Sequence, residues 1–389
     1  MNIKIAMKRI FCLVLVLSTL LGSNASALSA PQSPALPVSA PSAVLMERET
    51  GQIIFQREAR SRLSPASVTK IMTLLLIAEA LERGSIKLDG IVTASERAAS
   101  FGGSCVYLET GEQMTVSDMI KCIAVVSAND CAVAMAEYLA GSEENFVAMM
   151  NERAQQLGLE DTHFTNCTGL ADDDEHYTSA YDVAIMSREL LRHTLIKRYT
   201  TIWMDSIRGG EFELSNTNKL VYWYPGCTGL KTGYTSAAKY CLSATAERDG
   251  VEYIAVVMHC DTLEGRNKDA EIMLDYAFAN YTLCPLYGGE KLPGVSVDMG
   301  EERTVGTSCP GSQYVLVPRN AGEPQYSIDL PAAVRAPVEA GQRLGTLTVS
   351  MGGKTVAEVP ICAAASVERR SFFGIVRLLA GTLAGLYRI

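Results

Sequence analysis

The sequence predicts an α+β fold: an antiparallel sheet flanked by helices, an all-helical region beside it, and a small C-terminal β domain. Strand-like segments stand at both ends of residues 43–284, and helical patterns fill the interval between them. This order is typical of one sheet with helices packed around it. From residue 285 the sequence changes to glycine, proline and short alternating runs, which indicate a small β domain over residues 285–365.

Residues 1–27 have the pattern of a secretory signal peptide. A basic start precedes an apolar core over residues 10–21, and Ala25-Ser26-Ala27 forms a small-residue cleavage site. A transmembrane anchor is the alternative, but the apolar run is short for a span. We therefore expect an exported protein at the cell wall or at the outer face of the cytoplasmic membrane. The basic residues of the start are Lys4, Lys8 and Arg9.

The elements of the main domain follow from local patterns. Residues 28–42 are rich in serine, alanine and proline and predict a flexible leader. Residues 43–56 predict two strands joined by a turn. Residues 240–247 and 251–259 predict a hairpin around Arg248-Asp249-Gly250. Helical periodicity covers residues 115–126, 131–140, 143–157, 181–193 and 266–281.

A Ser-x-x-Lys motif, Ser67 to Lys70, opens a helix predicted over residues 64–84. Ser64 is a candidate N-cap, and Pro65 suits the first helical position. The next two turns are apolar nearly all round, so the helix is predicted to be buried. Because residues three apart are neighbours on a helix, the Lys70 amine can approach the Ser67 hydroxyl. Free N–H groups at this end of the helix favour developing negative charge.

Two further triplets support a catalytic interpretation. A Ser-x-x-Lys pair should occur about once or twice by chance in a chain of this length, and a second copy, Ser236 to Lys239, has no buried helix behind it. Ser127-Ala128-Asn129 and Lys231-Thr232-Gly233 each occur once, in the order found in penicillin-binding proteins and β-lactamases. The chain thus resembles the serine D-alanyl-D-alanine carboxypeptidases of low molecular mass, peptidase family S11.

The resemblance extends from about residue 43 to about residue 359. It includes residues 63–73 around the Ser-x-x-Lys motif and a segment, residues 164–180, that is similar to the Ω-type loop of the family. It implies the transpeptidase fold of penicillin-binding proteins and β-lactamases for residues 43–284. For residues 285–365 it implies the C-terminal β domain of the same family.

Lys70 must lose its proton to activate Ser67. A solvated lysine, with a pKa near 10.4, is almost wholly protonated at neutral pH. Burial of Lys70 and a second cation, Lys231, would both disfavour the charged form. We expect neutral Lys70 to take the Ser67 proton while the hydroxyl attacks the peptide carbonyl.

The resemblance implies roles for the remaining site residues. Ser127 would pass the proton to the leaving amine. Asn129 would hold the substrate carbonyl or orient Lys70, and Lys231 would supply charge for the substrate carboxylate and for Ser127. Thr232, Thr235 and Arg266 would bind that carboxylate, Gly233 would leave room for substrate along the strand, and the N–H groups of Ser67 and Tyr234 would form the oxyanion hole.

The implied reaction removes the terminal D-alanine from peptidoglycan stems that end in D-Ala-D-Ala, through an acyl-enzyme that β-lactams trap. Alternatives are a D,D-endopeptidase, a β-lactamase or a β-lactam sensor without turnover. Residues 165–170 lack the glutamate that class A β-lactamases use for deacylation. Histidine and cysteine spacing predicts no metal or other cofactor. The formal net charge of −9 argues against nucleic-acid binding.

The cysteines and the C-terminal segment each allow two interpretations. Ten cysteines follow Cys12, an even number that allows disulfides in an exported protein, yet several lie in apolar stretches that favour buried thiols. Residues 366–389 combine apolar residues at helical spacing with Arg369 and Arg370. Their longest uncharged run is about ten residues, short of the roughly 20 that span a bilayer. A helix in the membrane interface is expected, with docking on the β domain as the alternative.

Overall fold

The computed structural model describes residues 34–170, 174–287, 292–311 and 313–383. The predicted signal peptide, residues 1–27, and the first part of the predicted leader lie outside the described residues, as do residues 384–389. The described chain begins with a helix-and-sheet part, and a β part follows it.

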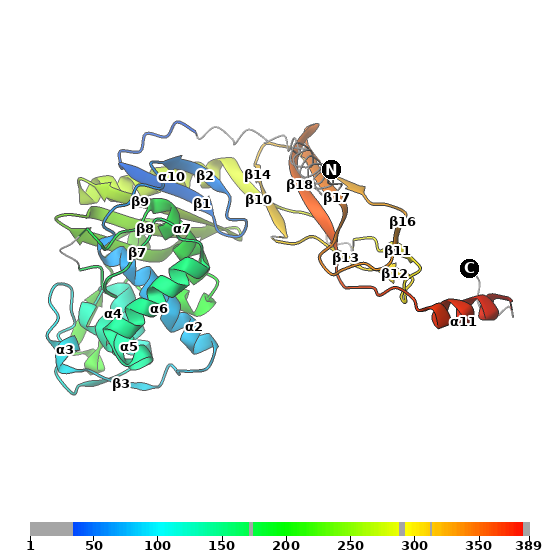
Figure 1. The fold of residues 1–389 in the computed structure, drawn as a ribbon. Coiled ribbons are helices and arrows are strands. Elements are labelled where there is room, and N and C mark those ends of the chain that lie inside the picture. Colours follow the sequence, from blue (N-terminus) through cyan, green and yellow to red (C-terminus); the bar gives the residue numbers. More distant parts are fainter. Residues whose placement is uncertain (1–33, 171–173, 288–291, 312, 384–389) are drawn as a thin grey trace, which may run out of the picture. The chain divides into compact units, whose positions relative to one another are not determined.

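A five-stranded antiparallel sheet forms the centre of the first part (Figure 1). Its strand order, β2-β1-β9-β8-β7, places two strands from the start of the domain beside three from its end, which confirms the predicted α+β arrangement. The predicted hairpin is β8 and β9, and β7 lies last in the order. The strands are β1 (Ser42–Glu47), β2 (Ile53–Arg57), β7 (Cys227–Thr235), β8 (Lys239–Arg248) and β9 (Val251–Cys260).

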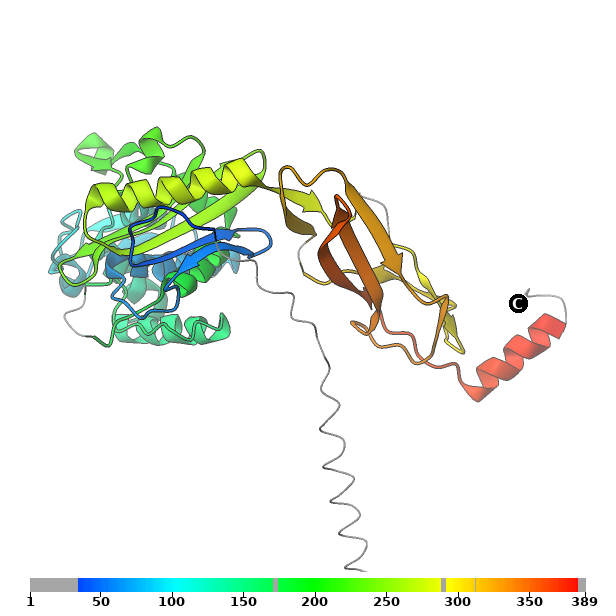
Figure 2. The same cartoon turned by 90° about the horizontal axis from the view of Figure 1, so that it is seen from above.

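Helices cover both faces of this sheet. On β1, alternate residues enter different cores: Val44 and Met46 face one cluster, and Ala43 and Leu45 face the other. Helix α10 packs on β8 and β9 (Figure 2), and α7 packs on β1 and β9. The helices are α2 (Lys70–Glu82), α3 (Glu96–Ala99), α4 (Val116–Val125), α5 (Asn129–Ala140), α6 (Glu143–Gln156), α7 (Ala180–Leu190), α8 (Lys197–Thr200), α9 (Leu220–Trp223) and α10 (Leu263–Asn280).

Helix α2 is buried nearly all round, as its sequence predicts, and lies among α5, α6 and α7. Its beginning differs from the prediction. Ser67 lies in a separate 3₁₀ turn, Ala66–Thr69, and Lys70 is the first α-helical residue. Pro65 precedes the turn without a side-chain cap, so Ser64 as N-cap is wrong. The turn is stabilised instead by Thr69, whose hydroxyl donates to the carbonyl of Ala66 at 2.8 Å.

Several short elements were not predicted, because each is too short for a periodic pattern to develop. They include two small two-stranded antiparallel sheets, one in the segment before α4, where α3 lies between the two strands, and one between α8 and α9. They are β3 (Ile91–Thr93) with β4 (Gln113–Thr115), and β5 (Met204–Ile207) with β6 (Phe212–Ser215). Two additional 3₁₀ turns are Thr194–Ile196 and Arg208–Gly210.

The second part is built of strands, as predicted, and its described residues form three small sheets. The largest has the order β13-β18-β17-β15, in which β17 and β18 form an antiparallel hairpin. The strands are β10 (Tyr281–Pro285), β11 (Val295–Asp298), β12 (Thr304–Val305), β13 (Thr307–Ser308), β14 (Tyr314–Pro318), β15 (Pro324–Asp329), β16 (Ala333–Arg335), β17 (Arg343–Met351) and β18 (Lys354–Ala363).

Helix α11, Phe372–Leu383, ends the described chain. Phe372 and Phe373 at its start are 74% and 83% exposed. Among the described helices, none combines the length and the apolar character needed to cross a bilayer. Every cysteine of the described residues carries a free thiol, and seven of these ten are buried.

Candidate active site

The turn that carries Ser67 is held by the Ω-type loop. Thr69 Oγ1 lies 2.7 Å from His176 Nε2, and the backbone N–H of Thr165 donates to His176 Nδ1 at 3.0 Å. Because Nδ1 accepts, a neutral His176 carries its proton on Nε2 and donates to Thr69. The sequence had indicated His176 only as part of the loop. Its contact with Thr69 depends on the folded loop, which no sequence spacing reveals.

The Lys70 amine is surrounded by three oxygen atoms. Nζ lies 2.9 Å from Ser67 Oγ, 2.6 Å from Asn129 Oδ1 and 2.9 Å from the carbonyl oxygen of Thr168. A neutral amine has two N–H bonds and one lone pair. Asn129 and Thr168 can accept the two N–H bonds, so the lone pair remains for the Ser67 hydroxyl.

Burial lowers the pKa of Lys70 from 10.5 to about 7, against a smaller opposing effect of Cys167, Cys105 and Asp130. The predicted cause, desolvation, is therefore the leading one. A lysine with this pKa is about half neutral at pH 7, so it can serve as a base.

Ser127 lies between α4 and α5, directly before Ala128 and Asn129. Its backbone has a φ of 66°, and its Oγ is buried without a hydrogen-bond partner among the described residues. Buried hydroxyl groups nearly always have a partner, because an unpaired one costs free energy. A group that substrate supplies would satisfy this hydroxyl.

Lys231 and Arg266 add two buried cations. Burial holds the pKa of Lys231 well below its usual range, and the charges of Lys70 and Arg266 lower it further. Lys231 Nζ donates to the carbonyl of Thr232 at 3.0 Å. Arg266, in α10, is 3% exposed, so it is not a solvated surface arginine, and burial lowers its pKa. Its guanidinium donates to Asn267 Oδ1 at 3.2 and 3.1 Å.

Strand β7 runs against the 3₁₀ turn that carries Ser67. A Cβ at Gly233 would lie 2.6 Å from the Pro65 carbonyl oxygen and 3.1 Å from the Ser67 nitrogen. The missing side chain therefore lets the strand approach the turn, whereas the sequence interpretation assigned the space to substrate alone. Tyr234 is exposed and stacks on Tyr240 with ring centroids 4.4 Å apart.

The two predicted carboxylate-binding threonines have different surroundings. Thr235 Oγ1 accepts a hydrogen bond from the Ala238 nitrogen at 3.0 Å. Thr232 Oγ1 lies 2.7 Å from Thr217 Oγ1, and the Thr217 nitrogen donates to the carbonyl of Val125 at the end of α4 at 3.0 Å. Thr217 thus joins β7 to the helix that leads to Ser127. Sequence reasoning missed this residue, although the Asn-Thr-Asn run at 216–218 is a turn signal.

The second Ser-x-x-Lys copy does not belong to the site. Ser236 lies in the turn between β7 and β8, Lys239 is the first residue of β8, and its half-exposed amine pairs with Asp261 at 2.5 Å. Across the described residues, histidine, cysteine, aspartate and glutamate side chains form no group of three that could hold a metal ion.

Comparison with protein families gives two matches. Residues 27–262 match the peptidase S11 model, D-alanyl-D-alanine carboxypeptidase, and residues 285–369 match the model of the C-terminal domain of penicillin-binding protein 5. The D-alanyl-D-alanine carboxypeptidase DacF of Bacillus subtilis is 43% identical over 348 residues, which cover 88% of this chain and 89% of that protein.

Solved structures agree with this result. Penicillin-binding protein 5 of Haemophilus influenzae is 30% identical and superimposes with a TM-score of 0.78, covering 87% of this chain and 99% of that structure. Penicillin-binding protein D2 of Listeria monocytogenes, in its ampicillin-bound form, is 29% identical with a TM-score of 0.58, covering 63% of this chain and 100% of that structure. The chain therefore belongs to the D-alanyl-D-alanine carboxypeptidases of peptidase family S11.

Proposed function

We propose that Ser67 is the nucleophile of this serine D-alanyl-D-alanine carboxypeptidase and that Lys70 is its general base. The observation that carries the proposal is the position of the buried Lys70 amine, 2.9 Å from Ser67 Oγ with two more oxygen atoms to accept its N–H bonds. The substrate is a peptidoglycan stem peptide that ends in D-Ala-D-Ala.

In the acylation step, the Ser67 proton moves to Lys70 Nζ while Oγ attacks the carbonyl carbon of the penultimate D-alanine. The negative charge that develops on the carbonyl oxygen would be stabilised by the backbone N–H groups of Ser67 and Tyr234. Ser127, whose buried hydroxyl has no partner among the described residues, would pass the proton to the leaving amine. The C–N bond then breaks and D-alanine leaves.

The terminal carboxylate would bind Lys231, Thr232, Thr235 and Arg266. An opposite charge favours the charged form of a lysine, so the bound carboxylate would raise the pKa of Lys231. The repulsion among the buried cations, which the free site carries, would thereby become attraction for substrate. Water then hydrolyses the ester on Ser67. A β-lactam would acylate Ser67 in the same way, and the resulting ester would be hydrolysed slowly.

Acylation by penicillin tests the proposal. After brief exposure of the full chain, intact mass should increase by one penicillin, and peptide mapping should locate it on Ser67. Lys70→Arg keeps a positive charge but cannot deprotonate, so its acylation should be about 100- to 10,000-fold slower. A modified residue other than Ser67, or a Lys70→Arg variant with the wild-type rate, would contradict the proposal.

Two proposals concern location. The pattern of residues 1–27 supports export, after which the enzyme would act outside the cytoplasm. The exposed Phe372 and Phe373, next to Arg369 and Arg370, support binding of α11 to the membrane interface.

A further inference from the structure

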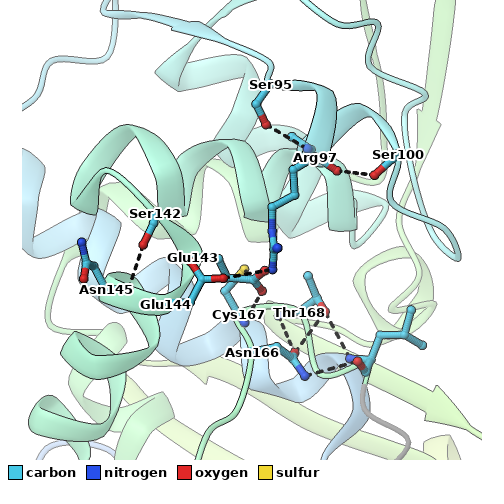
Figure 3. Close-up of polar contacts among 12 residues, drawn as sticks. Ser95, Arg97, Ser100, Ser142, Glu143, Glu144, Asn145, Asn166, Cys167 and Thr168 are labelled. Atoms are coloured by element: carbon cyan, nitrogen blue, oxygen red, sulfur yellow. Dashed lines mark hydrogen bonds and ion pairs between the residues drawn. The ribbon is translucent and has the colours of Figure 1, made fainter.

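A buried carboxylate lies beneath the Ω-type loop, next to the Lys70 pocket. Glu143 is the first residue of α6 and is 3% exposed. One of its oxygen atoms accepts from the Arg97 guanidinium at 2.5 Å. The other accepts from the Cys167 backbone nitrogen at 3.2 Å and from the Cys167 thiol at 3.3 Å. Figure 3 shows Arg97 extending from α3 to this carboxylate, with Cys167 on its other side.

Glu143 does not bind its own helix end. Ser142 is the N-cap of α6, and its hydroxyl accepts from the Asn145 nitrogen at 3.2 Å. The Glu143 side chain points away to a loop more than 20 residues later in the sequence. Burial of a carboxylate costs free energy unless it is paired and hydrogen-bonded. Arg97 supplies the charge, and Cys167 supplies the hydrogen bonds.

The loop continues from Cys167 directly to the Lys70 amine. The next residue, Thr168, places its carbonyl oxygen 2.9 Å from Lys70 Nζ. Asn166 fixes the other side of this short turn, because its Oδ1 accepts from the nitrogens of Thr168 at 3.0 Å and Gly169 at 2.7 Å (Figure 3). The direction of the Thr168 carbonyl therefore depends on Asn166 within the loop and on two contacts to Cys167 from outside it. One is Glu143, and the other is Thr73 of α2, whose hydroxyl donates to the Cys167 carbonyl at 2.7 Å.

We propose that Glu143, held by Arg97, is a positioning residue that sets the Thr168 carbonyl against the Lys70 amine. The inference rests on the proposed role of Lys70 as base. Without the contact to Glu143, the carbonyl would move off Nζ, and the neutral amine would lose one of the two acceptors that direct its lone pair toward Ser67. The charged ammonium form of Lys70 would lose more stabilisation than the neutral amine, because a hydrogen bond to a charged group favours the charged form.

Two changes in acylation follow from this displacement. The plateau rate at high pH falls, because the lone pair of Lys70 is no longer aimed at Ser67. The acidic limb of the pH profile moves to lower pH, because the pKa of Lys70 decreases. The other groups that face Lys70 are Lys231 from β7, Asp130 from α5, Cys105 and Cys167, and none of them is substituted in the variants described below.

The test measures the second-order rate constant of acylation by a fluorescent penicillin against pH, together with the melting temperature, on the full chain. Glu143→Ala should lower the plateau by about 10- to 100-fold and shift the limb to lower pH. Arg97→Gln should change both in the same direction by less. Glu143→Gln keeps an acceptor for the Cys167 nitrogen. Its plateau rate and the position of its acidic limb should therefore lie close to those of the wild type.

Arg153→Gln is the matched control, because Arg153 in the last turns of α6 pairs with Glu79 at 2.8 Å and Glu189 at 2.9 Å, away from Lys70. It should lower the melting temperature and leave the limb in place. An unchanged limb and plateau in Glu143→Ala would overturn the inference. It would also be overturned if Glu143→Gln shifted the limb as far as Glu143→Ala does, because loss of the negative charge alone would then be the cause. If Glu143→Ala does not fold, an unchanged profile in Arg97→Gln overturns it.

Failure of the proposed function would look different. A wild-type protein that is not acylated on Ser67, or Lys70→Arg that is acylated normally, would remove Lys70 as base whatever the Glu143 variants do. The wild-type protein could be acylated on Ser67 with an acidic limb that depends on Lys70, while Glu143→Ala behaves as the wild type does. This result would contradict only the role of Glu143.

Discussion

Gly169 of the Ω-type loop lies against Ala66 of the 3₁₀ turn that carries Ser67 so closely that a Cβ at position 169 would be 1.8 Å from the Ala66 carbonyl oxygen. It would also lie 2.6 Å from Thr69 Oγ1. On its other side, the turn meets Gly233 of β7. The residues around Ser67 are therefore held between two segments that approach only because both present glycine.

Gly169→Ala should disrupt the site by displacing the loop from the turn. The positive φ of 80° alone costs an alanine about 1–2 kcal/mol, and the close approach to Ala66 adds to that cost. Gly141→Ala is a matched control, because Gly141 has a φ of 79° and open space where its Cβ would be. We expect Gly169→Ala to lower the melting temperature more than Gly141→Ala and to reduce penicillin acylation, measured under identical conditions.

The pH dependence of acylation follows from Lys70. Burial lowers its pKa to about 7, and only the neutral amine can accept the Ser67 proton. The neutral fraction increases with pH, so kcat/KM should rise about tenfold per pH unit below the pKa and level off above it. Stopped-flow acylation across this range measures the limb. A limb near the ordinary lysine value would show that burial does not lower the pKa as the structure implies.

The sequence predicted the parts of this protein that depend on periodic patterns. The strands at both ends of residues 43–284 and the buried helix after Ser67 follow from hydrophobic spacing, and the structure contains them. The predicted start of that helix was wrong, because the position of the turn before it depends on the segments that pack against it. Gly169 and His176 come from a loop whose path no local pattern encodes.

Site residues that lie in local sequence motifs were predicted, and those that act through contacts of the folded chain were missed. Ser67, Lys70 and Asn129 contribute reactive or polar side chains in recognisable motifs, and the structure brings them together. Thr168 contributes only a backbone carbonyl, which any residue type could provide. Thr217 acts through a hydroxyl of ordinary type, and its contact with Thr232 becomes visible only when β7 is placed beside the preceding loop.

Thr217→Val should weaken substrate binding. The Thr232 hydroxyl donates to Thr217 Oγ1 at 2.7 Å, so Thr217 fixes the orientation of the Thr232 side chain that is proposed to bind the substrate carboxylate. Valine has a similar shape but no hydroxyl, and loss of one such hydrogen bond costs about 1 kcal/mol. We expect kcat/KM for a D-Ala-D-Ala peptide to fall about fivefold, mainly through KM. Thr217→Ser should retain the wild-type value, and an equal loss in Thr217→Ser and Thr217→Val would exclude this explanation.

Removing residues 366–389 should release the protein from membranes. The full chain, the truncated chain and a Phe372→Ser, Phe373→Ser double variant would be compared by sedimentation with vesicles of anionic phosphatidylglycerol. Each phenylalanine contributes about 1.5–3 kcal/mol when it leaves water, so the double variant should bind at least about 100-fold more weakly. Met204→Ser is the control, because Met204 is also exposed but lies in the hairpin before α9. It should bind as the wild type does. Equal vesicle binding by the full and truncated chains would place the membrane contact elsewhere, and α11 would then lose its proposed role.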